Sequence, residues 1–212
     1  MIALRNNILR GVFLVFTILF LTIFISTPVS AAVYYVAVNG SDGNSGTEAL
    51  PWLTIGKAAH SMAAGDTVYI KSGIYNERVI PENSGSEENY ILYAAYPGDA
   101  VTIDGSNVSV PEDEGLFYIS GKRFIRISGL KVVNSAQAGI YVNASSSDII
   151  IEKNYTYNTG SSGIGVWNSS DIIIDGNEVE SSCSNGWQEN ITVAGTNGFE
   201  VRNNHVHNEM PG

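Results

Sequence analysis

Four acidic residues recur at a fixed spacing and could bind a metal ion. Asp148 and Asp171 lie 23 residues apart, and Glu152 and Asp175 repeat the same step. If this step is one turn of a repeating structure, the members of each pair stack about 5 Å apart, at the spacing of neighbouring strands. Carboxylate oxygens are the ligands that Ca²⁺ prefers. The spacing therefore predicts two carboxylate columns that could hold calcium. The alternative is that the acidic residues are turn residues at exposed corners, which recur only because the structure repeats.

Aromatic and histidine side chains form two further candidate sites. Three aromatic residues on neighbouring repeats could stack on sugar rings or could instead pack in the core and at corners: Tyr157, Trp167 and Trp187. His205 and His207 are two positions apart and would lie on one face of a strand, as a metal-binding pair would. The sequence shows no third ligand for that pair, and the segment also fits an ordinary corner of a repeat.

All of these residues belong to one repeating pattern, with a period of roughly 25 residues. Ile127 recurs as Ile151, Ile174 and Val201, at nearly even steps. Each copy is a short apolar segment with period-two alternation, and clusters of Ser, Asn and Gly follow it as turns. Such a period is typical of a solenoid, in which each repeat buries its apolar face on its neighbours.

The contents of the repeat favour an all-β solenoid. The apolar segments are rich in Ile and Val, as strands are, whereas a leucine-rich repeat needs a leucine consensus and no leucine follows Leu130. Asn154, Asn177 and Asn204 share one offset from the repeated strand and predict an asparagine ladder at a corner. We therefore predict a single-stranded parallel β-helix of about five or six coils.

The chain begins with a segment that is typical of an export signal. Arg5 and Arg10 give a positive start, residues 12–25 form an apolar run, and Val29-Ser30-Ala31 offers small residues for cleavage. The run is short for a membrane span of about 20 residues, although an uncleaved anchor is the alternative. We expect residues 1–31 to be a signal peptide, with no membrane span left after its cleavage.

The remaining chain divides into a cap and a β-helix. Residues 32–65 predict a capping strand and a short helix, with helical spacing over 51–64. Residues 66–212 predict the β-helix, and the acidic insertions 81–89 and 111–114 should build groove walls at coil corners. The sequence stops in the middle of a coil without a polar closing cap, so we expect a truncated β-helix, either a monomer or part of a longer chain.

The charge of the chain argues against a nucleic-acid partner. The formal net charge is −10, and without Arg5 and Arg10 the remainder carries −12. Phosphate backbones require a basic footprint, which this chain lacks. The same charge opposes simple electrostatic capture of an acidic polymer, unless calcium bridges the two negative partners.

Several segments resemble the secreted right-handed parallel β-helix proteins of the pectate-lyase-like superfamily, in particular the group with an N-terminal domain of unknown function. The segments that carry the resemblance are Tyr34-Tyr35-Val36, Asn39-Gly40-Ser41-Asp42, Pro51-Trp52-Leu53-Thr54-Ile55, Gly65-Asp66-Thr67-Val68-Tyr69-Ile70 and Val101-Thr102-Ile103-Asp104-Gly105-Ser106. The resemblance covers essentially all of the chain after the signal and implies a right-handed β-helix. It is weaker for function, because the superfamily includes several lyases, epimerases and surface proteins without known activity.

For an enzyme, the resemblance implies β-elimination on a uronic acid polymer. Relatives use Lys or Arg as the base that removes the C5 proton, and often calcium to neutralise the neighbouring carboxylate. The candidate bases here are Arg126, which should point outward from its strand, and Lys131 and Lys153, which follow their strands near a bend. Each of them could equally be a solvated cation on a polar face.

Two functions remain open from the sequence. The first is an exported, secreted or cell-surface β-helix that engages extracellular polysaccharide, with lyase activity as its enzymatic form. The second is a non-catalytic carbohydrate-binding or structural module, which the absence of a compact multi-aspartate calcium motif favours.

Overall fold

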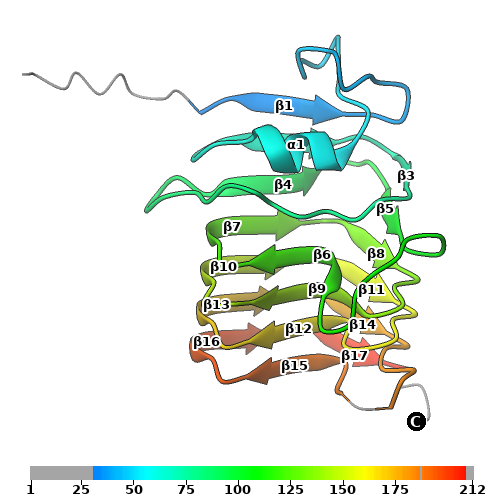
Figure 1. The fold of residues 1–212 in the computed structure, drawn as a ribbon, viewed down its shortest axis with the longest axis vertical. Helices are drawn as coiled ribbons and strands as arrows, with labels where there is room; N and C mark the ends of the chain where they lie inside the picture. Colours follow the sequence, from blue (N-terminus) through cyan, green and yellow to red (C-terminus); the bar gives the residue numbers. More distant parts are fainter. Residues whose placement is uncertain (1–30, 187, 209–212) are drawn as a thin grey trace, which may run out of the picture.

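The computed structural model describes residues 31–186 and 188–208 of the chain, so residues 1–30 of the predicted signal peptide lie outside the described residues. Figure 1 shows the backbone winding through successive coils that stack along one axis. Each full coil contributes one strand to each of three parallel sheets, which we call sheets A, B and C. The structure thus confirms the predicted all-β parallel β-helix.

Sheet A is the longest of the three and carries the repeat that the sequence revealed. Its strands are β1 (Val33–Val36), β2 (Thr67–Ile70), β4 (Ile91–Ala95), β7 (Arg123–Ser128), β10 (Ser147–Glu152), β13 (Ser170–Asp175) and β16 (Asn197–Arg202). Ile151 pairs with Ile127 on one side and with Ile174 on the other, and Ile174 pairs with Val201. The predicted register is therefore confirmed.

Sheets B and C complete the coils. Sheet B contains β3 (Gly73–Tyr75), β5 (Val101–Asp104), β8 (Lys131–Val133), β11 (Tyr155–Tyr157), β14 (Glu178–Glu180) and β17 (His205–His207). Sheet C contains β6 (Gly115–Ser120), β9 (Ala138–Asn143), β12 (Ile164–Trp167) and β15 (Ile191–Ala194). In chain order each coil runs from sheet A to sheet B to sheet C. The solenoid therefore has three outer faces, one for each sheet.

The core consists of columns of inward-facing β-branched side chains. Ile127, Ile151 and Ile174 from sheet A and Ile140 and Ile164 from sheet C are all fully buried. Burying each such side chain is worth about 1.5–3 kcal/mol, so the repeated Ile positions contribute to the driving force for stacking at every coil. The inward residues of the last described coil are partly exposed, because no described coil covers them.

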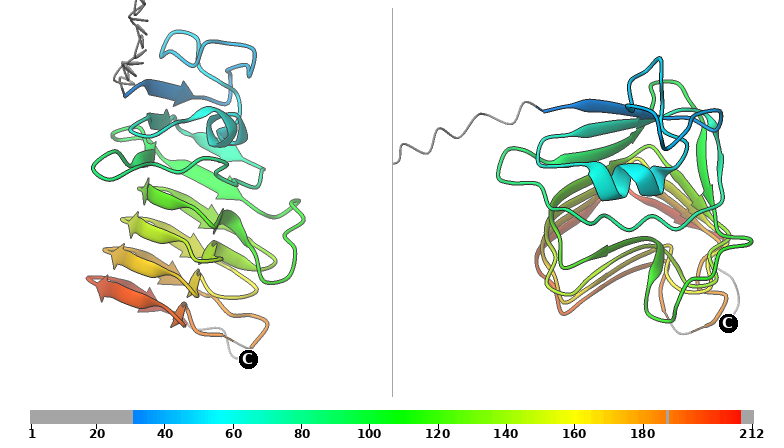
Figure 2. Two further views of the ribbon diagram at one scale, coloured as in Figure 1. Left: turned by 60° about the vertical axis from the view of Figure 1, so that its left-hand side comes forward. Right: turned by 45° about the horizontal axis from the view of Figure 1, so that its top comes forward.

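One end of the stack carries the predicted strand and helix. The helix α1 (Ile55–Ser61) is shorter than the 51–64 spacing predicted, because the Thr54 hydroxyl caps its start by accepting from Lys57 N and Met62 returns to extended backbone. Its buried face, formed by Ile55, Ala58 and Ala59, packs on the core. In the right-hand view of Figure 2, α1 lies over the interior of the coils. None of the helices in the described part of the chain has the length and apolar character that a bilayer crossing requires.

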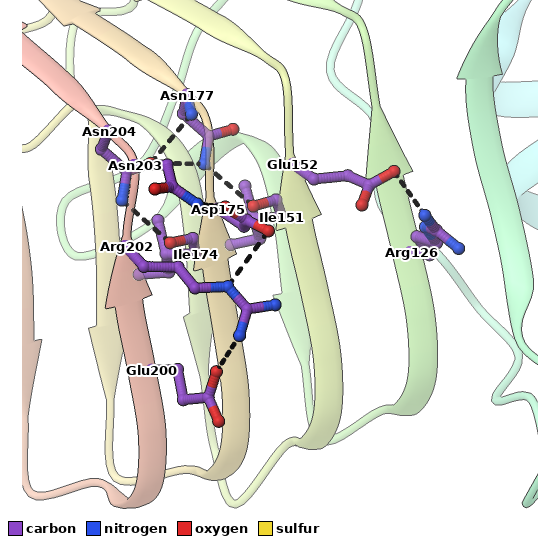
Figure 3. A network of polar contacts seen from close by, with 10 residues as sticks. All are labelled: Arg126, Ile151, Glu152, Ile174, Asp175, Asn177, Glu200, Arg202, Asn203 and Asn204. Atoms are coloured by element: carbon purple, nitrogen blue, oxygen red, sulfur yellow. Dashed lines mark hydrogen bonds and ion pairs between the residues drawn. The ribbon is translucent and has the colours of Figure 1, made fainter.

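A buried asparagine ladder forms the corner between sheets A and B (Figure 3). The Nδ2 group of Asn177 donates to Ile151 O at 2.9 Å and to Asn204 Oδ1 at 2.9 Å. Its Oδ1 atom accepts from the backbone N–H of Asn154 at 3.0 Å and from Asn154 Nδ2 at 3.1 Å. Each asparagine thus satisfies backbone groups of its neighbours at a sharp bend. The predicted ladder is confirmed.

Candidate functional site

Side chains on the outer face of sheet A pair with one another across neighbouring coils (Figure 3). Arg126 on β7 donates from Nη2 to Glu152 Oε1 at 2.6 Å. Arg202 on β16 contacts Asp175 Oδ2 through Nε at 3.2 Å and also pairs with Glu200. Glu152 and Asp175 stack in register, as the sequence predicts. Both carboxylates of this column are therefore already neutralised by guanidinium groups.

The second predicted carboxylate column lies inside the strands of sheet A. Asp148 and Asp171 are the second residues of β10 and β13, where left-handed φ angles of 57° and 56° interrupt the pairing of the two strands. Asp148 Oδ2 accepts from Ser147 Oγ at 2.7 Å and lies 3.6 Å from Arg123 Nη2. Asp171 is exposed, and both aspartates border a hollow on the outer face of sheet A.

The outer face of sheet B carries two columns of aromatic, acidic and imidazole side chains. In register along the sheet, the first column is Lys131, Tyr155, Glu178 and His205, and the second is Val133, Tyr157, Glu180 and His207. The Lys131 ammonium lies 5.8 Å from the centroid of the Tyr155 ring, a cation–π contact. The rings of Tyr155 and Tyr157 are parallel with centroids 6.3 Å apart. This face is thus a continuous polar ladder rather than a cleft.

A groove runs along the outer face of sheet C. One hollow of about 480 Å³ is bordered by Asp113, Tyr141, Trp167 and Gln188. A second hollow of about 200 Å³ shares Asp113 and Gln188 with the first and extends to Gln137. We call this surface, defined by these five residues, the sheet C groove. Its aromatic rings, amides and a carboxylate are the groups that sugar-binding surfaces use.

Tyr141 forms the floor of the sheet C groove. Its ring crosses the neighbouring coil at Gly165, where an added Cβ would lie only 2.8 Å from Tyr141 Cδ2. The ring also lies against Tyr118, with centroids 6.2 Å apart. Burial, and secondarily the charge of Asp113, raises the pKa of the Tyr141 phenol to about 12. The phenol therefore stays neutral at physiological pH and can donate a hydrogen bond.

The predicted insertion 111–114 is one wall of the sheet C groove. Arg78 fixes this wall: its Nε donates to Gly115 O at 2.9 Å, its guanidinium pairs with Glu114, and its charge lies 5.1 Å from the Tyr118 ring centroid. These contacts tie the acidic segment to the start of β6 and hold Asp113 over the groove. The prediction that this insertion builds a groove wall is confirmed.

The structure distributes the predicted site residues over all three outer faces. Arg126, Glu152, Asp175, Asp148 and Asp171 lie on sheet A, Lys153 at the corner between sheets A and B, Lys131 and Tyr157 on sheet B, and Trp167 on sheet C. Trp187 lies outside the described residues. The roles assigned to these residues stay predictions, but the side chains do not form a single site.

Three groove or ladder residues were missed by the sequence reasoning. The outward position of Tyr141 follows from the alternation about the buried Ile140 and Val142, but its residue type and spacing do not single it out. Gln188 lies in an irregular loop that no periodicity places. Glu178 precedes His205 by the same step that separates Asp175 from Arg202, its register partner on sheet A, so its position beside the histidine was available from the repeat.

The carboxylates predicted to hold calcium do not converge on one point. Ca²⁺ takes six to eight oxygen ligands. Among the described residues, no three carboxylates converge to within ligand distance of one another, and those of the Glu152–Asp175 column already contact arginines. The predicted residues therefore do not form a ready calcium site, and calcium binding stays a prediction that would need oxygen ligands from substrate or water.

Two curated proteins are similar to part of the chain. The chain is 40% identical over 129 residues to the uncharacterized protein YwoF of Bacillus subtilis, a match that covers 57% of this chain and 28% of that protein. It is 28% identical over 132 residues to pectate lyase PEL9 of Emericella nidulans, a match that covers 57% of this chain and 32% of the lyase. The chain thus spans about a third or less of the length of these curated relatives.

Solved structures show the same fold. The crystal structure of pectate lyase Pel9A superposes with a TM-score of 0.50 at 20% identity, over 80% of this chain and 50% of that one. The structure of XylC with xylose gives a TM-score of 0.51 at 14% identity, over 84% and 58% of the two chains.

The match to a family model shows the family of the chain. The model described as the Pel9A-like right-handed β-helix region matches residues 34–208, which is most of the chain. The resemblance to pectate-lyase-like proteins is thereby confirmed, together with the hand of the helix. The chain belongs to the Pel9A-like right-handed β-helix family.

Proposed function

We propose that this chain binds an acidic polysaccharide of the uronic acid type in the sheet C groove, within an exported, carbohydrate-active protein. The observation that carries the proposal is the groove itself, in which Trp167 offers aromatic surface beside the largely buried Tyr141 ring, and Asp113 and Gln188 offer polar partners. Membership of the Pel9A-like family and the likeness to a curated pectate lyase support the same class of ligand.

We propose cleavage by β-elimination as the enzymatic form of this function. A base takes the C5 proton of a uronate residue, the electron pair forms the C4–C5 double bond, and the glycosidic oxygen at C4 leaves. Arg126 is half-buried and already pairs with Glu152, whereas Lys131 and Lys153 are exposed, so these two lysines are the predicted bases freer to act. Because the chain carries a net charge of −10, a cation such as Ca²⁺ would help an acidic polymer to approach.

The second candidate function is a non-catalytic carbohydrate-binding module. It is favoured by one observation: Arg126, Lys131 and Lys153 are not among the residues that border the sheet C groove. A ligand in that groove would therefore meet aromatic and amide groups without any of the three predicted bases. The two functions make different predictions for catalysis and the same prediction for binding.

The deciding experiment measures turnover and binding separately. The chain is incubated with pectate, alginate and chondroitin, with and without Ca²⁺, and the ultraviolet absorbance of the unsaturated product is followed. A rise that K131A or K153A abolishes would establish a lyase and its base. A flat trace combined with retained binding would leave the non-catalytic module, and loss of both activity and binding would overturn the proposal.

Binding is measured by affinity electrophoresis in gels that contain each polymer. Trp167→Ala should strongly reduce the retardation, whereas Tyr157→Ala on sheet B is the matched aromatic control and should leave it unchanged. If Tyr157→Ala were the damaging change, the ligand would lie on sheet B and the assignment to the sheet C groove would be wrong.

A further inference from the structure

We propose that Glu178, His205 and His207 form a binding site for a borderline divalent cation such as Zn²⁺, and that the ion links two neighbouring coils. The site lies on the outer face of sheet B, away from the residues that border the sheet C groove. It does not depend on the proposed polysaccharide function, and neither its ligands nor its metal are those predicted for the calcium columns.

The strand register brings the three ligands together. Glu178 on β14 pairs with His205 on β17, and His207 lies two positions further along the same strand, so all three side chains share one face. One ligand atom from each residue lies within 4.8 Å of the others. His207 Nε2 is 3.0 Å from Glu178 Oε1, and the two imidazole rings stack with centroids 4.4 Å apart.

Small side-chain rotations would complete the coordination. Metal–ligand bonds of about 2.0–2.1 Å in a tetrahedral site place ligand atoms about 3.3–3.4 Å apart. The His207–Glu178 contact is already close to that value, and no separation in the group must shorten by more than roughly 1.4 Å. The Glu178 side chain is 49% exposed and that of His207 is 25% exposed, which leaves them free to adjust. A water molecule would supply the fourth ligand.

The surrounding charges favour a cation at this point. Glu180, the register partner of His207, accepts hydrogen bonds from the Tyr155 hydroxyl and from Asn208 Nδ2, the latter at 3.0 Å. These two hydrogen bonds hold the Glu180 carboxylate beside the three ligands. Two carboxylates and two imidazoles therefore face solvent together on adjoining coils.

The donor set selects the metal. Imidazole nitrogens suit Zn²⁺, Cu²⁺ and Ni²⁺, whereas Ca²⁺ prefers an all-oxygen shell of six to eight ligands. Two nitrogens and one carboxylate oxygen are thus matched to Zn²⁺ rather than to calcium. This difference separates the proposed zinc site from any calcium effect on polysaccharide cleavage.

The chain contains its own control in its remaining histidine. His60 on α1 pairs with Glu82 through Nδ1 and Oε2 at 2.7 Å, which resembles the His207–Glu178 contact. No third ligand joins that pair among the described residues. His60→Ala therefore removes an exposed His–Glu pair without touching the proposed site.

The test is calorimetric titration of ZnCl₂ into the full chain, purified without a histidine tag at pH 7.5. We expect saturable binding with one ion per chain. H205A and H207A should each weaken the affinity by at least the roughly 10- to 100-fold that outer-shell changes cost at metal sites. E178Q should weaken it measurably, H60A should leave it unchanged, and excess CaCl₂ should not compete.

A second readout covers variants that fold poorly. Substoichiometric Co²⁺ should give visible absorption with the wild-type chain and with H60A but not with H207A, and Zn²⁺ should raise the melting temperature of the same two proteins as its concentration rises. Absence of saturable zinc binding would overturn the proposal. Binding that survives H205A and H207A, or that falls equally in H60A, would overturn it as well.

Discussion

The outer faces of sheets A and C belong to the same coils but use their polar side chains in opposite ways. On sheet A, Arg126 and Arg202 neutralise the stacked carboxylates Glu152 and Asp175. On sheet C, polar and aromatic side chains border an open groove instead of one another. Regular stacking brings register partners such as Asp175 and Arg202 to about 5 Å of each other, and Arg126 reaches Glu152 diagonally across two neighbouring strands.

The groove arises where the coils depart from regularity. Its walls are residues 111–114 before β6 and the loop between β14 and β15 that contains Gln188. Both segments lengthen a coil between sheets B and C, whereas the corner between sheets A and B stays tight under the asparagine ladder. In this structure the charged residues at repeated positions of sheet A pair with one another, whereas the irregular segments between sheets B and C border the surface that can accept a ligand.

Sheets A and C keep their positions only if the coils stay stacked. Asn177→Ala should destabilise this stack more than any other substitution proposed here. The substitution leaves the Asn154 backbone N–H and the Ile151 carbonyl without their buried partners. With about 1–3 kcal/mol for each unsatisfied buried group, we expect a loss of about 3–4 kcal/mol in the free energy of unfolding. Urea denaturation measures this loss.

The control for the ladder is an asparagine with a single exposed hydrogen bond. Asn76 Nδ2 donates to Asp104 O at 3.2 Å on the surface. Asn76→Ala should cost no more than about 1 kcal/mol. Equal losses for the two substitutions would show that the buried ladder does not hold the corner.

The second prediction compares the two faces directly by substituting one residue on each. Trp167→Ala removes aromatic surface from the sheet C groove and should weaken uronate binding about 10- to 30-fold, which corresponds to about 1.4–2 kcal/mol. Arg126→Ala removes a cation that already pairs with Glu152 on sheet A and should change binding less than about twofold, as a rim charge does. Gel retardation on pectate measures both, and a larger effect of Arg126→Ala would reverse the assignment of the faces.

The third prediction tests how the groove floor is built. Gly165→Ala places a methyl group 2.8 Å from Tyr141 Cδ2 and 3.1 Å from Cε2, so the ring must shift. We expect a loss of about 1 kcal/mol in stability, at the low end of overpacking costs. In the background of Tyr141→Ala the same glycine substitution should cost almost nothing. Additive losses in this double-mutant cycle would mean that the ring does not lie over Gly165.

The sequence was sufficient to predict the scaffold because the scaffold is periodic. Ile127, Ile151 and Ile174 repeat the inward position, and the asparagine offset repeats the corner, so the strand register can be counted directly from the residue numbers. Helix α1 was predicted too long, because the Thr54 cap and the extended Met62 are local features that apolar spacing does not reveal.

The site was less predictable because it combines periodic and irregular parts. Trp167 was identified from its aromatic character, and the wall at residues 111–114 from its acidic insertion. Tyr141 and Gln188 were not, since one lies between apolar residues of a strand and the other lies in a loop. The candidate bases Arg126 and Lys131 and the candidate sugar-binding residue Trp167 were chosen by residue type, and the turns between sheets send their side chains to three different faces.

The smallest predicted effect concerns the pH dependence of stability that arises from the arginine-paired carboxylates on sheet A. Hydrogen bonds from Asn203 and contacts from Arg202 lower the pKa of Asp175 below its ordinary value of 3.8. A lowered pKa in the folded state contributes stability above the ordinary value and loses that contribution as pH falls through the folded pKa. Asp175→Asn should therefore slightly flatten the acid side of the stability profile, below pH 4, and only at low salt because the pair is exposed.

The matched control is Asp171→Asn on the same strand, where asparagine tolerates the left-handed backbone. If both substitutions flattened the profile equally, the arginine pairing on sheet A would not be what distinguishes its carboxylates from those of the groove.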